Sequence, residues 1–403
     1  MSREVVFVDG MRTAFGTLGK TLRNILGEDL AGMTLKGLVE RSKIVEKGGV
    51  VDGVFMGSAI GPNTAINGAR WPTLASGLPE STVASYIEMQ CGSAIDSINH
   101  AAWKILAGQS DIMIAGGYES YSQAPCRFSM SQEPFKMIPP LPIAPALSPT
   151  RDPATMNMGL TAEALQKMYN ISREAQDQFS YESHMKAAAA WKEGKFKDEV
   201  VPITVKETYV DENMKKKTRE YVVDKDEGIR VDTTVEGLSK LKPVFAVGGT
   251  VTAGNSSQTS DGAAFVIVMS EKMVKQLNLK PIARMVSYAT AGVDPRIMGI
   301  GPVAAIPKAL NIAGMKLDDI DLIELNEAFA AQSLAVVQEL GIDRKKLNVN
   351  GGAIAVGHPL GSSGARLSVQ LFNEMRRQKK KYGMVTACVG GGQGVAGIYE
   401  FLN

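Results

Sequence analysis

The sequence predicts a layered α/β fold made of two similar halves, with a segment of different character between them. Strand-like and helix-like stretches alternate over residues 1–121, and the same alternation returns from Pro281 to the C terminus. Residues 122–250 are instead rich in proline, then helical, then charged. Alternating elements are typical of α/β layers with mostly parallel strands. We therefore expect a first half over residues 1–121, an insertion over 122–250 and a second half over 276–403.

The first half contains clear local signals. "EVVFVDG", "VDGVFMGSA", "ASYIEMQ" and "DIMIAGG" read as strands, and a helix is predicted from about Glu28 to Ile44. A second helix follows Cys91, because Ile95, Ile98, Ala102 and Ile105 recur every three or four residues and would form one buried face. Gly108 predicts its end.

The second half repeats this style. "DIMIAGG" and "GMVTACVGG" each follow a helical stretch, and each ends a strand in glycines. A helix is expected near Pro302 to Gly314. The strand-like residues 251–272 would complete the first half after the insertion. The pattern predicts an internal duplication.

Composition excludes several classes of protein. Forty-four basic and forty-two acidic residues give a net charge of +2, so we expect no nucleic-acid partner. No uncharged apolar stretch is long enough to span a membrane, and the start lacks the basic-then-apolar order of a signal peptide. Three scattered cysteines allow neither a disulfide framework nor a zinc ribbon. A cytoplasmic, reducing environment is expected.

Cys91 and Cys126 differ in their surroundings. Cys91 lies where a predicted strand ends and a helix begins, so the helix N terminus should favour its thiolate, as in a nucleophilic cysteine. The alternative is a small buried hydrophobic residue. Cys126, in the proline-rich "APCRFSM", has no activating neighbour and is interpreted as structural or incidental.

His358 is the histidine best suited to proton transfer. It lies in "NGGAIAVGHPLGSSGAR", where glycines and Pro359 predict a fixed loop with close backbone contacts; a purely structural role is the alternative. His100 and His184 lie in helical stretches and are interpreted as ordinary surface or boundary residues. No histidine pair has metal-ligand spacing, so no metal site is expected.

Two phosphate-binding patterns are rejected. "GQGVAG" at 392–397 has too little chain after it to open a helix, and "AFGTLGKT" at 14–21 lacks the first glycine of a phosphate-binding loop. The absence of G-x-S-x-G also argues against a serine hydrolase. The charged stretch 206–232 is interpreted as solvated surface.

Taken together, the motifs resemble the thiolase family along nearly the whole chain. They are, in order, "RTAFGTLG", "CGSAIDSINHAAWKILAGQSDIMIAGGYES", "NMGLTAE", "GKFKDEVVPI", "GTVTAGNSSQTSDGAA", "LNEAFAAQ", "NGGAIAVGHPLGSSGAR" and "CVGGGQGVA". The resemblance implies a thiolase fold with a coenzyme A-binding loop domain inserted over 122–250. It also implies acyl transfer on coenzyme A thioesters, with no permanently bound cofactor and no metal.

The resemblance also implies roles for individual residues. Cys91 would carry the acyl group, His358 would activate Cys91, and Cys388 would be the second, acid/base cysteine. Asn326 would hold a water molecule in one oxyanion hole. The N–H groups of Gly390 and Cys91 would form the other, which would explain why a cysteine precedes the glycine-rich loop "CVGGGQG".

Coenzyme and acyl contacts are implied in the same way. Arg230 matches a contact to the coenzyme phosphates, with Lys215–Lys217 and Arg219 as weaker candidates. The remaining implied contacts are Ala253 and Ser257 along the pantetheine arm, and Met158 and Phe329 along the acyl tunnel.

The sequence departs from the short-chain biosynthetic members at three places. Asn157 replaces a histidine, Gly237 replaces a serine of the coenzyme-binding loop, and the segment 131–153 does not resemble their tetramer-forming loop. "GNSSQTSDGA" is nearer to the degradative members.

The predicted activity is the reversible condensation of two acetyl-CoA to acetoacetyl-CoA and CoA, through an acetyl-Cys91 intermediate. The alternatives are a degradative 3-ketoacyl-CoA thiolase for longer chains and a non-catalytic acyl-CoA-binding module. The resemblance implies a homodimer or a homotetramer.

Overall fold

The computed structural model describes residues 4–129, 139, 141–143, 147–150 and 152–402. The proline-rich segment 131–153, for which we predict no regular helix or central strand, lies mostly outside these residues. Within the described residues, no helix is long and apolar enough to cross a membrane.

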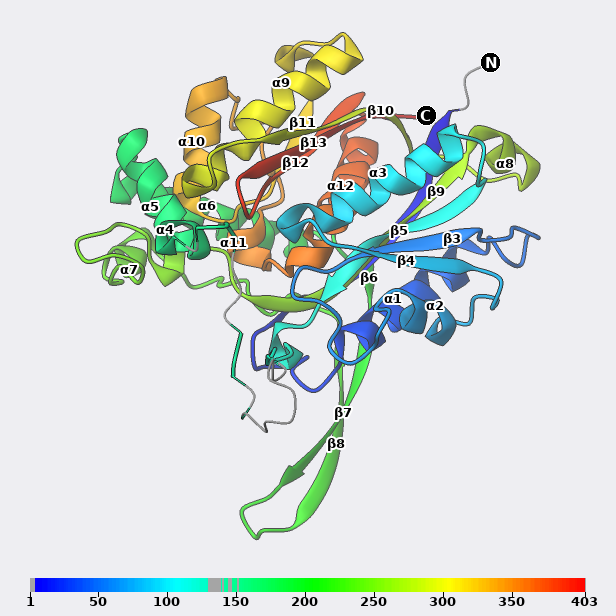
Figure 1. Ribbon diagram of the computed structural model, residues 1–403, viewed down its shortest axis with the longest axis horizontal. Helices are drawn as coiled ribbons and strands as arrows, with labels where there is room; N and C mark the ends of the chain where they lie inside the picture. Colours follow the sequence, from blue (N-terminus) through cyan, green and yellow to red (C-terminus); the bar gives the residue numbers. More distant parts are fainter. Residues whose placement is uncertain (1–3, 130–138, 140, 144–146, 151, 403) are drawn as a thin grey trace.

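One large sheet forms the centre of the protein (Figure 1). Its strand order is β11-β12-β13-β10-β1-β9-β5-β3-β4, and the short β2 and β6 pair with β9 and β1. The strands of its main path are β1 (Val5–Thr13), β3 (Gly53–Gly57), β4 (Val83–Ile87), β5 (Ile112–Glu119), β9 (Ser260–Ser270), β10 (Ala283–Gly292), β11 (Leu322–Leu325), β12 (Tyr382–Val389) and β13 (Gln393–Phe401). The additional strands are β2 (Gly16–Thr17), β6 (Val200–Val201) and the separate pair β7 (Ile203–Val210) and β8 (Lys216–Val223).

The two halves have the same topology, which confirms the predicted duplication. In the first half the order is β3-β5-β9-β1, and in the second it is β11-β12-β13-β10. In each half the first pair is parallel and the next two pairs are antiparallel. The halves join where β1 pairs antiparallel with β10.

The expectation of mostly parallel strands is wrong, because most neighbours along the main path are antiparallel. The cause lies in the connections. β12 returns as β13 through a tight glycine turn, and a tight turn can join only antiparallel strands. β9 is reached after the long insertion, which allows it to enter between β1 and β5 in the opposite direction.

The helices lie on both sides of the sheet and between its two halves. The regular helices are α1 (Gly27–Ser42), α2 (Arg70–Ala75), α3 (Ser93–Leu106), α4 (Pro153–Met156), α5 (Met158–Met168), α6 (Arg173–Lys192), α7 (Val235–Ser239), α8 (Glu271–Gln276), α9 (Gly301–Ala313), α10 (Ala330–Leu340), α11 (Ala353–Val356) and α12 (Leu360–Gln378). The 3₁₀ turns are η1 (Gln90–Gly92), η2 (Tyr121–Gln123), η3 (Ala253–Asn255), η4 (Pro295–Ile300) and η5 (Leu317–Asp319).

Two equivalent helices, α3 and α12, form the middle layer. They precede the equivalent strands β5 and β12, and they pack against each other and against strands of both halves (Figure 1). Every residue of α12 from Gly361 to Met375 is buried. Because both helices begin beside the ends of central strands, residues at their N termini are brought together from distant parts of the sequence.

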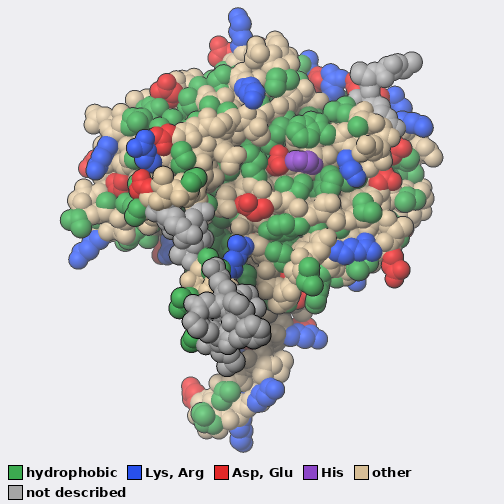
Figure 2. Space-filling view, viewed as in Figure 1, with side chains coloured by type: hydrophobic (Ala, Val, Ile, Leu, Met, Phe, Trp, Pro, Cys, Tyr) green, Lys and Arg blue, Asp and Glu red, His purple; other side chains and the backbone are tan. Residues whose placement is uncertain are grey.

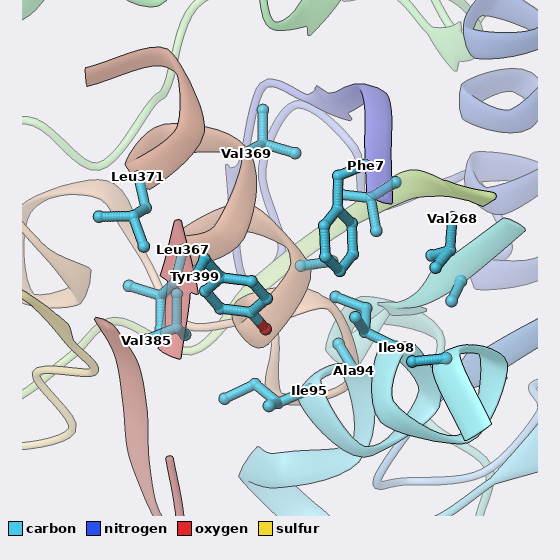
Figure 3. Close-up of a cluster of buried hydrophobic side chains, with 14 of the residues drawn as sticks. Phe7, Ala94, Ile95, Ile98, Val268, Leu367, Val369, Leu371, Val385 and Tyr399 are labelled. Atoms are coloured by element: carbon cyan, nitrogen blue, oxygen red, sulfur yellow. The ribbon is translucent and has the colours of Figure 1, made fainter. Parts of the chain in front are cut away.

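The apolar core between these layers fixes their positions (Figure 3). The rings of Phe7, Phe372 and Tyr399 have centroids 5.0–5.3 Å apart and come from β1, α12 and β13. Offset and edge-to-face contacts of this kind add to the free energy gained by burial. Phe7→Ala would lower the free energy of unfolding by about 3–5 kcal/mol.

We propose, from the sequence, that residues 1–121 with 251–272 form one unit, residues 122–250 a second and residues 276–403 a third. The position of β9 between β1 and β5 supports the first unit. Within the insertion, β7 and β8 form a hairpin that projects from the body of the molecule (Figure 1).

Candidate active site

A cavity of about 220 Å³ lies where α3 and α12 begin, and many of the predicted site residues surround it. Its lining includes six of them: Cys91, His358, Gly390, Ser257, Met158 and Phe329. These residues are far apart in the sequence. The middle layer and the glycine turn between β12 and β13 bring them together.

Cys91 lies in a tight turn that leads into α3. The preceding residue, Gln90, has a φ of +45°, which is unusual for a residue with a side chain. Local hydrogen bonds hold this turn: Oγ of Ser93 donates to the carbonyl of Gln90 at 2.7 Å and accepts the N–H of Met89 at 2.9 Å. Such stored strain is typical of functional sites.

The thiol of Cys91 is buried, and this corrects the expectation of a favoured thiolate. Burial raises the pKa of Cys91 to about 12, and the negative charges of Glu119 and Glu88 add to this. Hydrogen bonds from the backbone N–H groups of Gly390 and of Cys91 itself act in the opposite direction but do not offset it. The helix N terminus alone is therefore insufficient, and Cys91 needs a base to become a nucleophile.

The glycines after Cys388 are required by the backbone. Gly391 and Gly392 have φ values of +84° and +85°, and a Cβ on Gly392 would lie 2.4 Å from the carbonyl oxygen of Val293. The resulting turn carries Gly390 to the sulfur of Cys91. A side chain at Gly391 or Gly392 would strain the turn.

His358 is held in a closed loop before α12. Its backbone N–H donates to the carbonyl of Gln258 at 3.0 Å, and Gly357 before it has a φ of +112°. Burial, together with the positive charge of Arg366, lowers the pKa of His358 to about 3. The ring is therefore neutral at physiological pH and can accept a proton.

The hydrogen bonds of His358 fix its tautomer. Nδ1 lies 2.6 Å from Oγ of Ser363, and that hydroxyl donates its own hydrogen to the carbonyl of Pro359 at 2.8 Å. Assigning the hydroxyl hydrogen to Pro359 places the ring hydrogen on Nδ1 and the lone pair on Nε2. Nε2 lies 3.2 Å from the amide nitrogen of Asn326, which donates to it. The buried Oδ1 of Asn326 has no partner among the described residues.

Cys388, at the end of β12, is completely buried. It belongs to an apolar cluster with Phe329, Met298 and other residues beside the cavity. Burial raises the pKa of Cys388 well above its ordinary value, and the nearby Cys91 adds to this. In the resting protein this thiol is therefore protonated.

Large apolar side chains close the cavity. Met158 and Phe329 line it, and Phe245 and Met298 line it as well. The rings of Phe245 and Phe329 meet edge to face at 6.0 Å. Gly159 makes room for Phe245, because a Cβ there would lie 2.1 Å from its ring.

The structure places one of the three predicted coenzyme contacts at the cavity and the other two outside its lining. Ser257 lines the cavity, whereas Arg230 and Ala253 are exposed residues outside its lining. The backbone N–H of Arg230 donates to Nδ1 of His184 at 3.1 Å. His184 is 3% exposed, and burial with the charge of Arg230 lowers its pKa to about 4. Its interpretation as a surface or boundary residue is therefore wrong, because the loop before Arg230 covers it.

The weaker candidates lie on the projecting hairpin. Figure 2 shows basic side chains at its tip. Lys217 pairs with Asp211 at 2.8 Å, and Arg219 pairs with Glu207 at 2.5 Å. Neither residue lines the cavity. The exposed basic side chains fit the interpretation of this stretch as solvated surface. That interpretation is wrong for Glu207 and Asp226, which are buried, and Asp226 forms a buried ion pair with Arg12 at 2.7 Å.

The departures at Asn157 and Gly237 have local roles. Oδ1 of Asn157 accepts the N–H of Gly159 at 3.0 Å and caps α5. Gly237 lies in α7 and donates its N–H to Thr234.

Sequence reasoning missed Ser363, Phe245 and Met298. Ser363 follows His358 by one helical turn plus one residue, and a predicted helix start at Pro359 would have placed it under the ring. Nothing in the local sequence singles out Phe245 or Met298. Among the described residues, no group of three or more His, Cys, Asp or Glu side chains could hold a metal ion.

The chain is similar to known proteins along nearly its whole length. Residues 5–272 match the N-terminal thiolase domain, and residues 279–401 match the C-terminal thiolase domain. A 3-ketoacyl-CoA thiolase from Bacillus subtilis (strain 168) is 45% identical over 400 residues, which is 99% of each chain. An acetyl-CoA acetyltransferase from Chromobacterium violaceum is 44% identical over 395 residues, 98% of each.

Two solved structures are similar to this one over its whole length. The crystal structure of the Bacillus anthracis acetyl-CoA acetyltransferase superimposes with a TM-score of 0.89 at 40% identity, covering 100% of this chain and 99% of that one. The human mitochondrial 3-ketoacyl-CoA thiolase gives a TM-score of 0.88, with the same identity and coverage. With both domains matched in order and the cavity built at their junction, the chain belongs to the thiolase family.

Proposed function

We propose that this thiolase catalyses the reversible condensation of two acetyl-CoA molecules to acetoacetyl-CoA and CoA. The observation that carries the proposal is the convergence of Cys91, His358 and the N–H of Gly390 on one apolar cavity. A buried thiol, a neutral base and preorganised backbone donors are the groups that acyl transfer requires.

In the first half-reaction, Nε2 of His358 takes the proton of Cys91. The thiolate attacks the thioester carbonyl of acetyl-CoA, the C–S bond to the coenzyme breaks, and CoA leaves with the proton of Cys388, which becomes a thiolate. The N–H groups of Cys91 and Gly390 already point at the sulfur. In the tetrahedral intermediate they would donate to the new oxyanion beside it.

In the second half-reaction, Cys388 removes a proton from the methyl group of a second acetyl-CoA. The resulting carbanion attacks the acetyl carbonyl on Cys91, a carbon–carbon bond forms and the C–S bond to Cys91 breaks. The released thiolate of Cys91 takes back the proton held by His358. Charge develops on the thioester oxygen of the second substrate. His358 and Asn326, whose Oδ1 is free to bind a water molecule, would stabilise it.

The size of the cavity supports a four-carbon 3-oxoacyl substrate. The cavity has a volume of about 220 Å³, which is below the range usual for ligand-sized pockets. Its lining includes the side chains of Phe245, Phe329, Met158 and Met298. The competing proposal is a thiolase for longer chains, as the name of the Bacillus subtilis relative suggests. Steady-state thiolysis of acetoacetyl-CoA and of the eight- and sixteen-carbon 3-oxoacyl-CoA decides between them. A larger kcat/KM for either longer substrate would overturn the short-chain proposal.

A non-catalytic acyl-CoA-binding module is the alternative of a different class. The hydrogen-bonded Asn326–His358–Ser363 chain argues against it, because binding alone does not require an oriented neutral imidazole. Detectable binding of acetyl-CoA without thiolysis of any 3-oxoacyl-CoA would establish the binding module.

We also propose a homodimer, with a homotetramer as the larger alternative. β4 lies at the end of the sheet order, and Val83 on β4 and Trp103 on α3 are about half exposed, which suits contact with a second copy. A light-scattering mass near 43.1 kDa at micromolar concentration would contradict this assembly. A reducing cytoplasm would keep the free thiols Cys91 and Cys388 active.

A further inference from the structure

Glu119, at the end of β5, is a buried carboxylate that the proposed mechanism does not use. It is 1% exposed, and its oxygens accept four hydrogen bonds. Oε1 accepts from Oγ of Ser58 at 2.6 Å and from the N–H of Ile60 at 3.3 Å. Oε2 accepts from the N–H of Ala59 at 2.8 Å and from the N–H of Gly361 at 2.9 Å.

These donors come from both halves of the protein. Residues 58–60 follow β3 of the first half, whereas Gly361 lies in the first turn of α12, three residues after His358. Ser363, which binds Nδ1 of His358, belongs to the same turn. Through Gly361, Glu119 therefore holds the segment that orients the imidazole.

Backbone segments of the two halves lie in close contact around Glu119. A Cβ on Gly117 would lie 2.0 Å from the carbonyl oxygen of Gly361 and 2.3 Å from that of Gly57. A Cβ on Gly57 would lie 2.6 Å from Cβ of Ser93, at the start of α3. The ends of β3 and β5 and the starts of α3 and α12 are thus in direct contact. Cys91 and His358 are both carried by these starts.

The electrostatics distinguish a positional role from activation of the thiol. Burial raises the pKa of Glu119 to about 7, while its four donors act in the opposite direction. The charge of Glu119 raises the pKa of Cys91, so it opposes formation of the thiolate. No ion pair of Glu119 occurs in the described part of the chain. Its contribution to catalysis must therefore be geometric.

We propose that Glu119 is a positioning residue that ties the first turn of α12 to the end of β3, and thereby fixes His358 relative to Cys91. This inference rests on the proposed function. An error of about 1 Å between reacting groups can cost about 10²-fold in rate.

The test compares Glu119→Gln with Glu28→Gln in the full-length protein. Glutamine keeps the shape of Glu119, but its NH₂ group cannot accept N–H bonds. Glu28 is the matched control: it is also fully buried, and its Oε1 accepts the N–H groups of Thr64 and Ala65 at 2.8 and 2.9 Å. Neither of these donors lines the cavity.

Three measurements are made on each variant: the rate of the CoA burst with acetyl-CoA, the KM for acetoacetyl-CoA, and alkylation by iodoacetamide. Exposed Cys126 is the internal reference for alkylation. We expect Glu119→Gln to slow the burst and the alkylation of Cys91 by about 10²-fold. KM and the alkylation of Cys126 should change less than twofold. Glu28→Gln should leave all rates near wild type.

Each result either supports the positioning role of Glu119 or overturns it. A wild-type burst in Glu119→Gln, or equal losses in both variants, overturns it. If Glu119→Gln does not fold, Ser58→Ala replaces it, because this change removes only the 2.6 Å bond. A several-fold slower burst is then expected, and a wild-type burst would overturn the inference. A wild-type protein that never acetylates Cys91 would refute the proposed function instead, and relative alkylation of Cys91 would still test the positioning.

Discussion

Nδ1 of His358 lies 2.6 Å from Oγ of Ser363, and this hydroxyl donates in turn to the backbone carbonyl of Pro359. The bond is buried and leaves Nε2 as the proton acceptor. The reactivity of the site therefore depends on a serine that carries no chemistry of its own.

Ser363→Ala should lower the burst rate by at least tenfold, because the ring can then adopt the other tautomer and a buried N–H loses its acceptor. The free energy of unfolding should fall by about 1–3 kcal/mol. Ser362→Ala is the matched control, since Ser362 is equally buried and bonds only to Pro359, at 3.2 Å. Similar burst rates in the two variants would show that the bond to His358 has no role in catalysis.

The low pKa of His358 predicts an unusual pH profile. A histidine with an ordinary pKa near 6.5 would be only about one tenth neutral at pH 5.5, and the burst would slow about tenfold. His358, with a pKa of about 3, stays neutral, whereas Glu119, with a pKa of about 7, becomes protonated in this range. In the Glu119→Gln variant, whose side chain does not titrate, we therefore expect a burst rate that changes less than twofold between pH 7.5 and 5.5. A break near pH 6.5 in rapid-quench measurements would contradict this.

The lowered pKa of His358 also makes the free energy of unfolding depend on pH. Because the folded-state pKa of His358 lies below the unfolded value, the neutral ring stabilises the fold above about pH 6.5. This contribution is lost as the pH falls toward 3. Circular dichroism at pH 5.5 therefore serves as the control that the protein remains folded during the kinetic measurement.

Replacing each cysteine should separate the two half-reactions. Cys91→Ala should abolish both, because a methyl group is no nucleophile. Cys388→Ala should still acetylate Cys91 and release one CoA per active site, and then lose about 10²-fold or more in turnover for want of an acid/base. Mass spectrometry after mixing with acetyl-CoA locates the adduct, and Cys126→Ala is the control. An adduct on Cys388 of the wild type would reverse the two roles.

Arg230→Ala should raise the KM for the coenzyme thioester about tenfold at low salt, with little change in kcat. The change removes the charge but keeps the backbone N–H that binds His184. The effect should shrink in high salt, because exposed charges are screened. Arg219→Ala, on the hairpin, should leave KM near wild type. An unchanged KM in Arg230→Ala would show that Arg230 does not bind the coenzyme.

Local sequence determined many of the elements and singled out Cys91 and His358, whereas the proposed roles of Cys388, Asn326 and Gly390 came only from the family resemblance. The apolar repeat over Ile95–Ile105 predicted the helix that the structure places at Ser93–Leu106, and the glycines after Cys388 predicted a turn. The duplication was also visible from the sequence. These features depend on neighbours within a few residues, so a linear pattern contains them.

Tertiary structure alone decided the strand directions, the burial of His184 and the titration of the site. Sequence reasoning expected mostly parallel strands, a surface or boundary position for His184 and a favoured thiolate at Cys91. Burial comes from segments far away in the chain: the loop before Arg230 covers His184, and the turn at Gly390 meets Cys91. Desolvation by such distant segments outweighs the helix N terminus, which is why a local pattern singled out Cys91 but could not give its pKa.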